Sequence, residues 1–486
     1  MSPLPQTLYR TTDIRALEQS AIQKHGISGF ELMTRAGQAA FNCLTTHWPL
    51  AKSLAVICGS GNNAGDGYIV AKLAQLAGFQ VQVFSADPAK LKGDARLAFE
   101  QYQSSNSNML SLPDQAIEAD VIVDALLGTG LDRPVTGEYL AAIKAMNASV
   151  GGKLAIDIPS GLSADTGHCL GCAVQADITL TFIGLKQGLF SGQAVDYCGE
   201  ICFDGLAVPE SVFFDVSPSA HRVSKKNMPK RRRSAHKGNY GHVLVVGGAL
   251  GYSGAVKLAG EAALRVGAGL VSLATHPEHA SVLNFDRPEL MCHGIRTVAQ
   301  FNPLLEKATV LVLGPGLGQC EWAKSLFHAA IAAQQPIVMD ADALNLLAQS
   351  PATNSNWILT PHPGEAARLL ACSSAAIQQD RFAAVLSLQT KYQGTIVLKG
   401  SGTLIASNNL IAVSTTGNPG MASGGMGDVL AGVIGGLLAQ GYYPQEAAEQ
   451  GTYLHGLAAD HAAQASGERG LLARDLMPYL RTLLNS

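Results

Sequence analysis

Short apolar runs that end in glycine-rich turns recur along the whole chain. The run Ser53–Cys58 (SLAVIC) leads into GSGNNAGDG, and residues 242–248 (HVLVVGG) lead into a second glycine turn. Each turn is followed by apolar residues at helical spacing and then by another apolar run, VQVFSAD or VSLAT. This order of strand, turn, helix and strand predicts a doubly wound α/β fold, in which helices cover both faces of a parallel sheet.

The chain is long enough for two such sheets, and one segment separates them. Of its 486 residues, 206–240 lack a periodic pattern and are rich in proline, serine and positive charge. We therefore predict two domains, residues 1–222 and 223–486. The basic cluster within residues 225–233 has no interleaved aromatic residues. It favours a solvated linker over a nucleic-acid patch, with an acidic nucleotide as the next candidate ligand.

Charge and cysteine content narrow the classes of function. The formal net charge of −3 gives no bulk attraction to nucleic acid or acidic membranes. The first residues lack the pattern of a secretory signal, and no segment has the length and apolar character of a membrane span. The nine cysteines, an odd number, fit a reducing compartment. We expect a cytoplasmic protein with neither a nucleic-acid nor a membrane partner. Four of the cysteines, Cys169, Cys172, Cys198 and Cys202, could hold zinc, but their loose spacing disfavours it.

The first glycine loop fits two kinds of chemistry. Residues 59–64 match the loose dinucleotide fingerprint G-x-G-x-x-A, and Asp87 closes the next strand where a ribose-binding acid belongs. An NAD-dependent oxidoreductase is therefore one candidate. That motif does not require the polar residues at the centre of the loop, Asn62, Asn63 and Asp66. They offer oxygen ligands for a hard cation and hydrogen bonds for a polar ligand, or else they bond their own backbone as turn formers.

Polar side chains also follow two further apolar strands. VIVDALLG places Asp124 at the end of one strand, and AIDIPSG places Asp157 and Ser160 after another. Because ligands gather at the carboxyl ends of strands in an open parallel sheet, these side chains should face one crevice. Each aspartate could instead be only a helix cap or a turn former.

Residues 415–441 (TTGNPGMASGGMGDVLAGVIGGLLAQG) place a glycine-rich loop directly before a helix. The glycines let backbone N–H groups approach an anion, and the helix dipole adds to that attraction. Asp428 stands at the junction, where a carboxylate would repel phosphate, so we interpret it as a base that takes a proton from an attacking hydroxyl. The alternative role is a helix N-cap. Gly432 and Gly436 are expected on a packing face of this helix.

Two more motifs in the second half carry polar groups on tight turns, and no P-loop sequence is present. Residues 399–403 (KGSGT) combine an ammonium and hydroxyls with glycines, which suits the phosphates or ribose of an adenine nucleotide. A plain hairpin turn is the alternative. His362 lies between two prolines and is rigidly presented, either for binding or for a structural role.

The motifs of the first half resemble those of the NAD(P)H-hydrate epimerase domain. The resemblance rests on LYRTTDIRALEQ, ELMTRAGQAA, GSGNNAGDG, DALLGTGLDRPV and AIDIPSGLSADTG, and it covers roughly residues 1–220. It implies a Rossmann-like fold, a potassium ion held by Asn63, Asp124 and Ser160, and contact between Asp157 and the reacting ring. Ala64 stands where the family usually has glycine, and we expect a tighter fit there. The residues that would bind the hydrated dinucleotide are Asn62, Asn63, Ala64, Gly65, Asp66, Gly128, Thr129, Gly130, Leu131, Asp132, Arg133, Pro134 and Asp157.

The loop NPGMASGGMGDVLAG resembles the anion-hole loop of the ribokinase-like fold, in the version found in ADP- or ATP-dependent NAD(P)H-hydrate dehydratases. The resemblance covers roughly residues 224–486. It implies that Ala255, Gly316, His362 and Asp428 contact the hydrated dinucleotide. Asp340 and Asn345 fall where ribokinase-like relatives often arrange groups on the phosphate or magnesium side. The implied adenine-nucleotide contacts are Lys399, Gly400, Ser401, Gly402, Thr403 and Gly427.

Together the two resemblances imply a bifunctional repair enzyme for NAD(P)H that has added water across a ring double bond. The first domain would interconvert the R and S hydrates of NADH and NADPH with Asp157 and potassium. The second would dehydrate the S epimer with Asp428, using ADP or ATP with magnesium and giving AMP or ADP and phosphate. The resemblance favours ADP, and we expect a homo-oligomer.

Two alternatives belong to other classes. One is a ribokinase-like kinase of a small vitamin precursor, which would release a stable phosphorylated product and would leave the first domain non-catalytic. The other is a non-catalytic scaffold, because front domains of this type also occur in RNA-processing proteins. A scaffold does not need Asp157, Asp124 and the GNNAGDG loop, so their presence argues against it.

Overall fold

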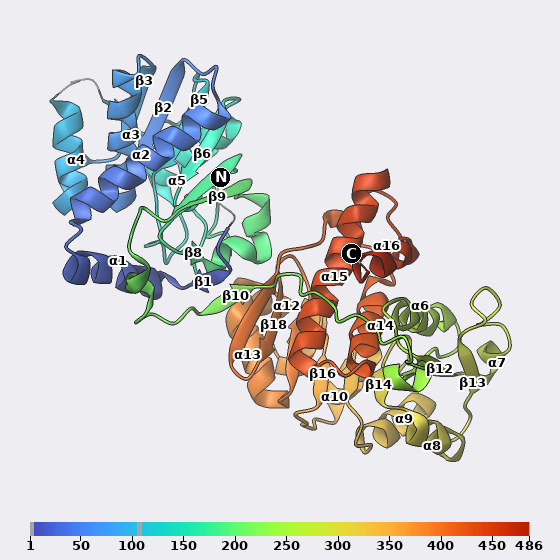
Figure 1. Cartoon of the computed structure of the whole chain (residues 1–486). Coiled ribbons are helices and arrows are strands. Elements are labelled where there is room, and N and C mark those ends of the chain that lie inside the picture. Colours follow the sequence, from blue (N-terminus) through green and yellow to red (C-terminus); the bar gives the residue numbers. More distant parts are fainter. Residues whose placement is uncertain (1–3, 105–108, 486) are drawn as a thin grey trace. The chain divides into compact units, whose positions relative to one another are not determined.

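The computed structural model describes residues 4–104 and 109–485, which form two compact units. One unit extends to His221, and the other begins at Arg222. Each unit contains a largely parallel sheet with helices on both faces (Figure 1). The predicted doubly wound α/β fold is therefore confirmed in both halves of the chain.

The sheet of the N-terminal unit has the strand order β4-β3-β2-β5-β6-β7-β9, and all its pairs are parallel. The order reverses between β2 and β5, so the turns after these two strands diverge and leave a crevice. Beside this sheet, β1 pairs with β8 in parallel and with β10 in antiparallel orientation. The strands are β1 (Thr7–Tyr9), β2 (Ser53–Cys58), β3 (Gln80–Ser85), β4 (Leu110–Ser111), β5 (Val121–Ala125), β6 (Gly152–Ile156), β7 (Ile178–Phe182), β8 (Leu185–Lys186), β9 (Glu200–Asp204) and β10 (Ala220–Arg222).

Side chains of β2 alternate between two cores. Leu54 and Val56 pack with residues of the first four helices, whereas Ala55 and Ile57 pack with α5. A strand that is buried on both faces must be apolar throughout, which explains the continuous run SLAVIC. The helices are α1 (Thr11–His25), α2 (Gly29–His47), α3 (Asn62–Leu76), α4 (Gly93–Gln103) and α5 (Gly137–Ala148), with 3-10 turns η1 (Pro88–Lys90), η2 (Gln187–Phe190), η3 (Gly192–Asp196) and η4 (Glu210–Phe213).

The sheet of the C-terminal unit runs β13-β12-β11-β14-β15-β16-β17-β18-β19. Its pairs are parallel up to β17, and two antiparallel hairpins then add β18 and β19. The strands are β11 (His242–Val246), β12 (Leu270–Thr275), β13 (Met291–Gly294), β14 (Val310–Leu313), β15 (Ile337–Met339), β16 (Trp357–Leu359), β17 (Thr395–Leu398), β18 (Thr403–Ser407) and β19 (Leu410–Ser414).

Close helix packing covers one face of this second sheet. A Cβ atom added at Gly432 would lie 2.1 Å from the Ala259 carbonyl oxygen, and one at Gly436 would lie 2.4 Å from Val266 Cγ2. The predicted glycine packing face is thus confirmed, and it brings α14 against α6 (Figure 1). The helices are α6 (Ser253–Arg265), α7 (Pro277–Ala280), α8 (Val298–Lys307), α9 (Glu321–Ile331), α10 (Ala341–Gln349), α11 (Pro363–Leu370), α12 (Ser374–Gln379), α13 (Arg381–Tyr392), α14 (Met426–Ala439), α15 (Pro444–Ser466) and α16 (Leu476–Leu483), with 3-10 turns η5 (Lys237–Tyr240), η6 (Pro419–Met421) and η7 (Ala473–Asp475).

The apolar run Ser53–Cys58 forms a strand with those bounds, β2, and the glycine-rich turn after it leads into α3 as predicted. Among the helices of the described residues, none combines the length and apolar composition needed to cross a membrane.

Candidate active sites

The crevice between the turns after β2 and β5 is a cavity of about 630 Å³. Its walls come from α1, α2 and the segments that follow β2, β5, β6 and β7. Predicted dinucleotide contacts that line it are Asn62, Asn63, Asp66, Gly128, Thr129, Gly130, Leu131, Asp132, Arg133 and Asp157. Ala64 and Gly65 are buried behind this wall, and Pro134 is exposed outside it. The structure therefore brings together most, but not all, of the predicted set.

Asp157 enters the cavity from a strained turn after β6. Its φ of 66° lies in the left-handed region, which aspartate adopts at a cost of about 1 kcal/mol or more. The carboxylate accepts hydrogen bonds from Thr181 Oγ1 and Phe182 N, both at 3.3 Å, and forms an ion pair with Lys186. The side chain of Lys186 is only 1% exposed. The turn thus places one buried charge pair in the wall of the cavity.

The sequence patterns indicated neither Lys186 nor Glu18, which lies on α1. Burial, followed by the charge of Asp157, raises the pKa of Glu18, and the same two causes raise the pKa of Asp66 well above its ordinary value. Lys186 opposes the shift at both carboxyls. This crevice therefore gathers the carboxyl groups of Glu18 and Asp66 and the ammonium of Lys186 around Asp157, a composition suited to moving protons. A single lysine in the apolar run TFIGLKQGLF was the available sequence signal.

The three residues predicted to hold potassium converge behind the same crevice. Ser160 Oγ donates to Asp124 Oδ1 at 2.5 Å, and Asn63 Nδ2 donates to the Leu127 carbonyl oxygen at 3.1 Å. Asn63 Oδ1 is buried and has no hydrogen-bond partner among the described residues. Burial raises the pKa of Asp124 to about 6. An unpaired amide oxygen beside a buried carboxyl is an arrangement that a hard cation would satisfy.

Asp87 does not occupy a ribose-binding position in this structure. Its carboxylate accepts a hydrogen bond from Ala89 N at 3.0 Å and caps η1 outside the cavity. Gly59 approaches the Leu126 carbonyl oxygen so closely that an added Cβ would lie at 1.9 Å. In this loop the first glycine of the fingerprint therefore serves the tight turn that a dinucleotide-binding loop also requires, so only the position of Asp87 argues against the oxidoreductase interpretation.

In the C-terminal unit, Asp428 lies in the first turn of α14. Gly425, with a φ of 91°, is the N-cap of this helix, so the alternative that Asp428 is the N-cap is wrong. Burial raises the pKa of Asp428 to about 7, and the carboxylates of Asp340, Asp342 and Glu365 add to the shift while Lys399 opposes it. A carboxyl with a pKa near neutrality can act as a general base at physiological pH.

The ammonium of Lys399 faces Asp428 from the turn after β17. Lys399 Nζ lies 2.6 Å from Asp340 Oδ1 and 3.8 Å from Glu365 Oε2. A Cβ added at Gly427 would lie 3.2 Å from that Nζ atom. Burial opposes the charged form of Lys399, but Asp340 and Glu365 raise its pKa above the ordinary value. The two predicted motifs, residues 399–403 and 424–428, therefore meet at one charged cluster.

Residues 399–402 also form the hairpin turn between β17 and β18, so the binding interpretation and the turn interpretation describe the same segment. Arg381, which is 1% exposed, supports the turn from beneath. Its guanidinium donates to the carbonyl oxygens of Leu398, Lys399 and Gly402 at 3.2–3.3 Å. Sequence analysis missed this residue, because nothing near it in the chain marks it.

His362 begins α11 beside the same cluster. Its Nδ1 accepts hydrogen bonds from Gly364 N at 3.0 Å and Glu365 N at 3.4 Å, which is a capping role. Burial and the charge of Lys399 lower the pKa of His362, whereas burial raises the pKa of Glu365 to about 7. Asn345, predicted loosely for the phosphate side, instead accepts a hydrogen bond from Arg368 Nε at 2.7 Å.

Ala255 and Gly316 lie together at a second point of the carboxyl edge. A Cβ added at Gly316 would lie 3.2 Å from the Ala255 Cβ. One helical turn further along α6, Leu258 Cδ1 would lie 2.6 Å from a Cβ added at Gly425. This contact connects the pair to the loop that carries Asp428.

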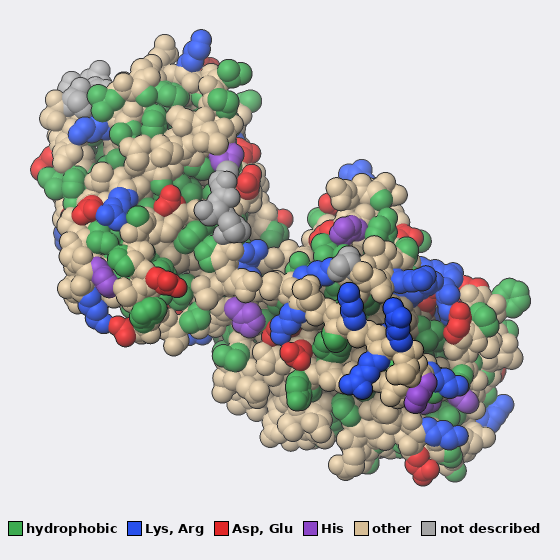
Figure 2. Space-filling view, viewed as in Figure 1, with side chains coloured by type: hydrophobic (Ala, Val, Ile, Leu, Met, Phe, Trp, Pro, Cys, Tyr) green, Lys and Arg blue, Asp and Glu red, His purple; other side chains and the backbone are tan. Residues whose placement is uncertain are grey.

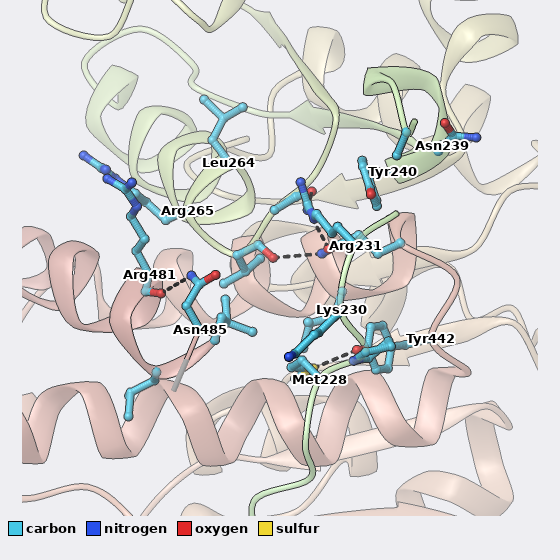
Figure 3. A pocket seen from close by; sticks show the side chains of 18 of the residues that line it. Met228, Lys230, Arg231, Asn239, Tyr240, Leu264, Arg265, Tyr442, Arg481 and Asn485 are labelled. Carbon is cyan, nitrogen blue, oxygen red and sulfur yellow. Dashed lines mark hydrogen bonds between the residues drawn. The ribbon is translucent and has the colours of Figure 1, made fainter. Parts of the chain in front are cut away.

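A larger cavity of about 1410 Å³ lies elsewhere in the C-terminal unit, against the basic segment (Figure 3). Arg231 anchors that segment: its guanidinium donates to the Gln440 side chain at 2.9 Å and stacks 3.7 Å from the Tyr240 ring centre. Figure 2 shows lysine and arginine side chains gathered on this unit. None of the residues predicted to bind nucleotide lines the cavity. Its cationic residues are Lys225, Lys230, Arg231, Arg232, Arg265, Arg287 and Arg481, against the acidic Glu261 and Glu289.

Comparison with known proteins gives consistent matches for both units. Residues 243–482 match the family described as NAD(P)H-hydrate dehydratase, and residues 29–188 match the family described as YjeF-related protein N-terminus. Over 485 residues the chain is 50% identical to a bifunctional NAD(P)H-hydrate repair enzyme Nnr from Coxiella burnetii, covering 98% of this chain and 99% of that protein.

Two solved structures resemble the second half. A ribokinase-like superfamily protein from Enterococcus faecalis is 33% identical with a TM-score of 0.49, covering 53% of this chain and 90% of that one. The ADP/ATP-dependent NAD(P)H-hydrate dehydratase from Bacillus subtilis, co-crystallized with ATP/Mg²⁺, is 29% identical with a TM-score of 0.48, covering 53% of this chain and 94% of that one.

Proposed function

The chain belongs to the family of bifunctional NAD(P)H-hydrate repair enzymes, and we propose that its two units divide the repair between the two sites described above. Residues 1–222 epimerise the R and S hydrates of NADH and NADPH. Residues 223–486 dehydrate the S epimer. The observation that carries this division is the presence of two separate carboxyl clusters, one around Asp157 and one around Asp428.

In the epimerase site, Asp157 exchanges a proton with the hydroxyl on the carbon next to the ring nitrogen. The nitrogen lone pair assists transient loss of the stereocentre. Lys186 forms an ion pair with Asp157, and the strained turn holds the carboxylate in the cavity wall. Glu18 and Asp66, whose pKa values are raised, are positioned to pass protons within the same crevice.

In the dehydratase site, Asp428 takes the proton from the hydroxyl of the S hydrate as that oxygen attacks the terminal phosphorus of the nucleotide. Hydroxide is a poor leaving group, and phosphorylation converts it into a good one. Backbone N–H groups of residues 424–427 and the ammonium of Lys399 stabilise the charge on the phosphoryl oxygens. Loss of phosphate and of one ring proton then restores the double bond of NAD(P)H.

The direct test is recovery of NADH absorbance from a mixed preparation of R and S hydrates, supplied with ADP or ATP and magnesium. The wild-type chain is expected to restore the whole mixture, with one nucleotide hydrolysed per NADH formed. Consumption of nucleotide on vitamin precursors, with the hydrates left unchanged, would support the kinase instead.

We propose ADP as the preferred donor, as the resemblance implies. The nucleotide would bring magnesium as its counter-ion, which would neutralise phosphate charge, and the protein would need to supply few ligands for it. The nine cysteines, all free in the structure, support a cytoplasmic location. The homo-oligomer stays a prediction.

We further propose that potassium binds between Asn63, Asp124 and Ser160, because Asn63 Oδ1 is buried there without a partner. Potassium chloride is expected to raise the Tm of the wild-type chain by about 2 °C or more over tetramethylammonium chloride at equal ionic strength. Asn63→Ala should lose this difference, whereas the exposed neighbour Asn62→Ala should keep it. Equal shifts in wild type and Asn63→Ala would contradict the site.

The pH profile of dehydration is expected to follow Asp428. Only the ionised carboxylate accepts a proton, so kcat/KM for the pure S hydrate should rise as pH increases through about 7 and level off above it. The profile is measured from about pH 5.5 to about pH 9 by NADH recovery. Glu365 titrates in the same range, so Glu365→Gln serves as the control and should keep the inflection. Loss of the inflection in Glu365→Gln alone would make Glu365 the base.

Nucleotide affinity is expected to depend on Lys399 and not on the cationic cavity. Lys399→Met should raise the KM for ADP at least about 10-fold, because a charge-assisted contact to phosphate is lost. The double variant Asp340→Asn/Lys399→Met avoids leaving a buried unpaired charge and should show the same increase. Arg232→Glu, which reverses a charge in the cationic cavity, should change the KM less than about 2-fold. A larger increase in the KM for ADP in Arg232→Glu than in Lys399→Met would indicate that the nucleotide binds in the cationic cavity.

A further inference from the structure

Metal-ligand side chains gather at the amino-terminal edge of the N-terminal sheet, at the opposite strand ends from the crevice. His47 ends α2, Glu200 begins the edge strand β9, and Cys202 follows at the middle of that strand. One ligand atom of each of these three residues lies within 4.8 Å of the others. No other such group of three occurs among residues 4–104 and 109–485. Neither catalytic site uses any of these residues.

A second thiol lies one helical turn before His47, beside this group of three. Cys43 Sγ is 3.6 Å from His47 Nδ1, and the Cys43 thiol forms a hydrogen bond with the Cys202 thiol. The spacing in the sequence explains why these side chains lie close together. Cys43 and His47 are four residues apart and share a face of α2, and Glu200 and Cys202 are two residues apart and share a face of β9. Cys202 is buried, Cys43 and His47 are half-buried, and Glu200 is exposed, so the cluster opens to solvent at one point.

The imidazole is oriented for ligation. His47 Nδ1 lies 2.8 Å from the Cys43 carbonyl oxygen. A carbonyl oxygen can only accept, so Nδ1 carries the hydrogen, and the lone pair of Nε2 is left for a metal. Metal-binding histidines commonly donate their other N–H to a backbone carbonyl or carboxylate in this way.

We propose that His47, Glu200 and Cys202 bind one Zn²⁺ ion and clamp the end of α2 to the edge strand β9. One thiol sulfur, one imidazole nitrogen and one carboxylate oxygen match the mixed donors that zinc prefers, and a water molecule would complete the four-coordinate shell. The same set disfavours magnesium and calcium, which prefer oxygen alone. This pairing differs from the sequence-based candidate set, because Cys202 meets Cys43 and not Cys169 or Cys172.

Cobalt(II) substitution tests the proposal on the intact chain, after reduction and removal of metal. One equivalent of Co²⁺ is expected to give a thiolate-to-metal charge-transfer band in the near ultraviolet and strong visible bands of tetrahedral cobalt. Zn²⁺ should displace both. Cys43→Ser/Cys202→Ser should lose the bands and bind at least about 100-fold more weakly. The matched control Cys169→Ser/Cys172→Ser should keep them.

Thermal unfolding gives a second readout. Zn²⁺ is expected to raise the Tm of the wild type and of the Cys169→Ser/Cys172→Ser control, but not that of Cys43→Ser/Cys202→Ser. Absence of a charge-transfer band in the reduced wild type would overturn the proposal. Bands that persist in Cys43→Ser/Cys202→Ser would also overturn it. A third outcome is that the reduced protein binds no metal and that a Cys43–Cys202 disulfide forms in air. This outcome would show a redox-sensitive thiol pair at this place and no zinc site.

Discussion

Asp428→Asn is expected to lower the rate of S-hydrate dehydration by about 10²–10⁴-fold while R and S hydrates still interconvert at the wild-type rate. The amide keeps the shape of the side chain but cannot accept the hydroxyl proton, and general-base catalysis contributes a factor of that size. Epimerisation is a control within the same molecule, because Asp157 belongs to the other unit.

The measurement follows NADH recovery from pure S hydrate with saturating nucleotide, and separately follows exchange between the epimers. Asp286→Asn, which changes an exposed carboxylate of the same unit, should leave dehydration within about 2-fold of wild type. Dehydration that survives in Asp428→Asn at the rate of the Asp286 variant would exclude Asp428 as the base.

The same substitution separates catalysis from folding. The pKa of Asp428 is raised in the folded chain, so folding disfavours its ionised form at any pH above about 7. A neutral amide removes that cost, and Gly425 rather than Asp428 caps the helix. The Tm of Asp428→Asn at alkaline pH should therefore equal or exceed that of the wild type. A loss of activity without a loss of stability is what a destabilised catalytic group produces.

Local patterns predicted the fold and the loops that carry the sites. The strand Ser53–Cys58 was predictable from its apolar run, because both faces of the sheet are covered. The packing face of α14 was predictable from the spacing of its two glycines, Gly432 and Gly436, on one side of the helix. Glycines and polar residues mark the loops after β2, β5 and β17 in the sequence. These features depend on neighbours in the chain, so the sequence displays them directly.

Partners that meet through the fold were not predictable in the same way. Lys186 reaches Asp157 across 29 positions, and Lys399 reaches Asp340 across 59. Neither pair shares an element, so no periodicity marks it. Cys43 and Cys202 are a stronger example, because no chain pattern relates a cysteine of α2 to one of β9, and only the fold brings the two thiols together.

Asp157→Asn is expected to stop enzymatic epimerisation, so that recovery of NADH from a mixed preparation ends at the S fraction. General acid–base catalysis by one carboxylate again sets the loss at about 10²–10⁴-fold. The amount of NADH formed with nucleotide in excess reports the effect directly, after subtraction of spontaneous epimerisation. Rapid dehydration of pure S hydrate by the same variant would show that the other unit is folded.

Two matched variants decide whether the charge pair or the dinucleotide fingerprint governs this site. Lys186→Met removes the ammonium that opposes the raised pKa values of Glu18 and Asp66, so these two carboxyls become harder to ionise and epimerisation should need a higher pH. Asp87→Asn should behave as wild type, because Asp87 caps η1 outside the cavity. The opposite pair of results would be a loss of epimerisation in Asp87→Asn and an unshifted pH profile in Lys186→Met. These results would mean that the ribose is bound as in an NAD-dependent oxidoreductase and that the nicotinamide lies away from Asp157.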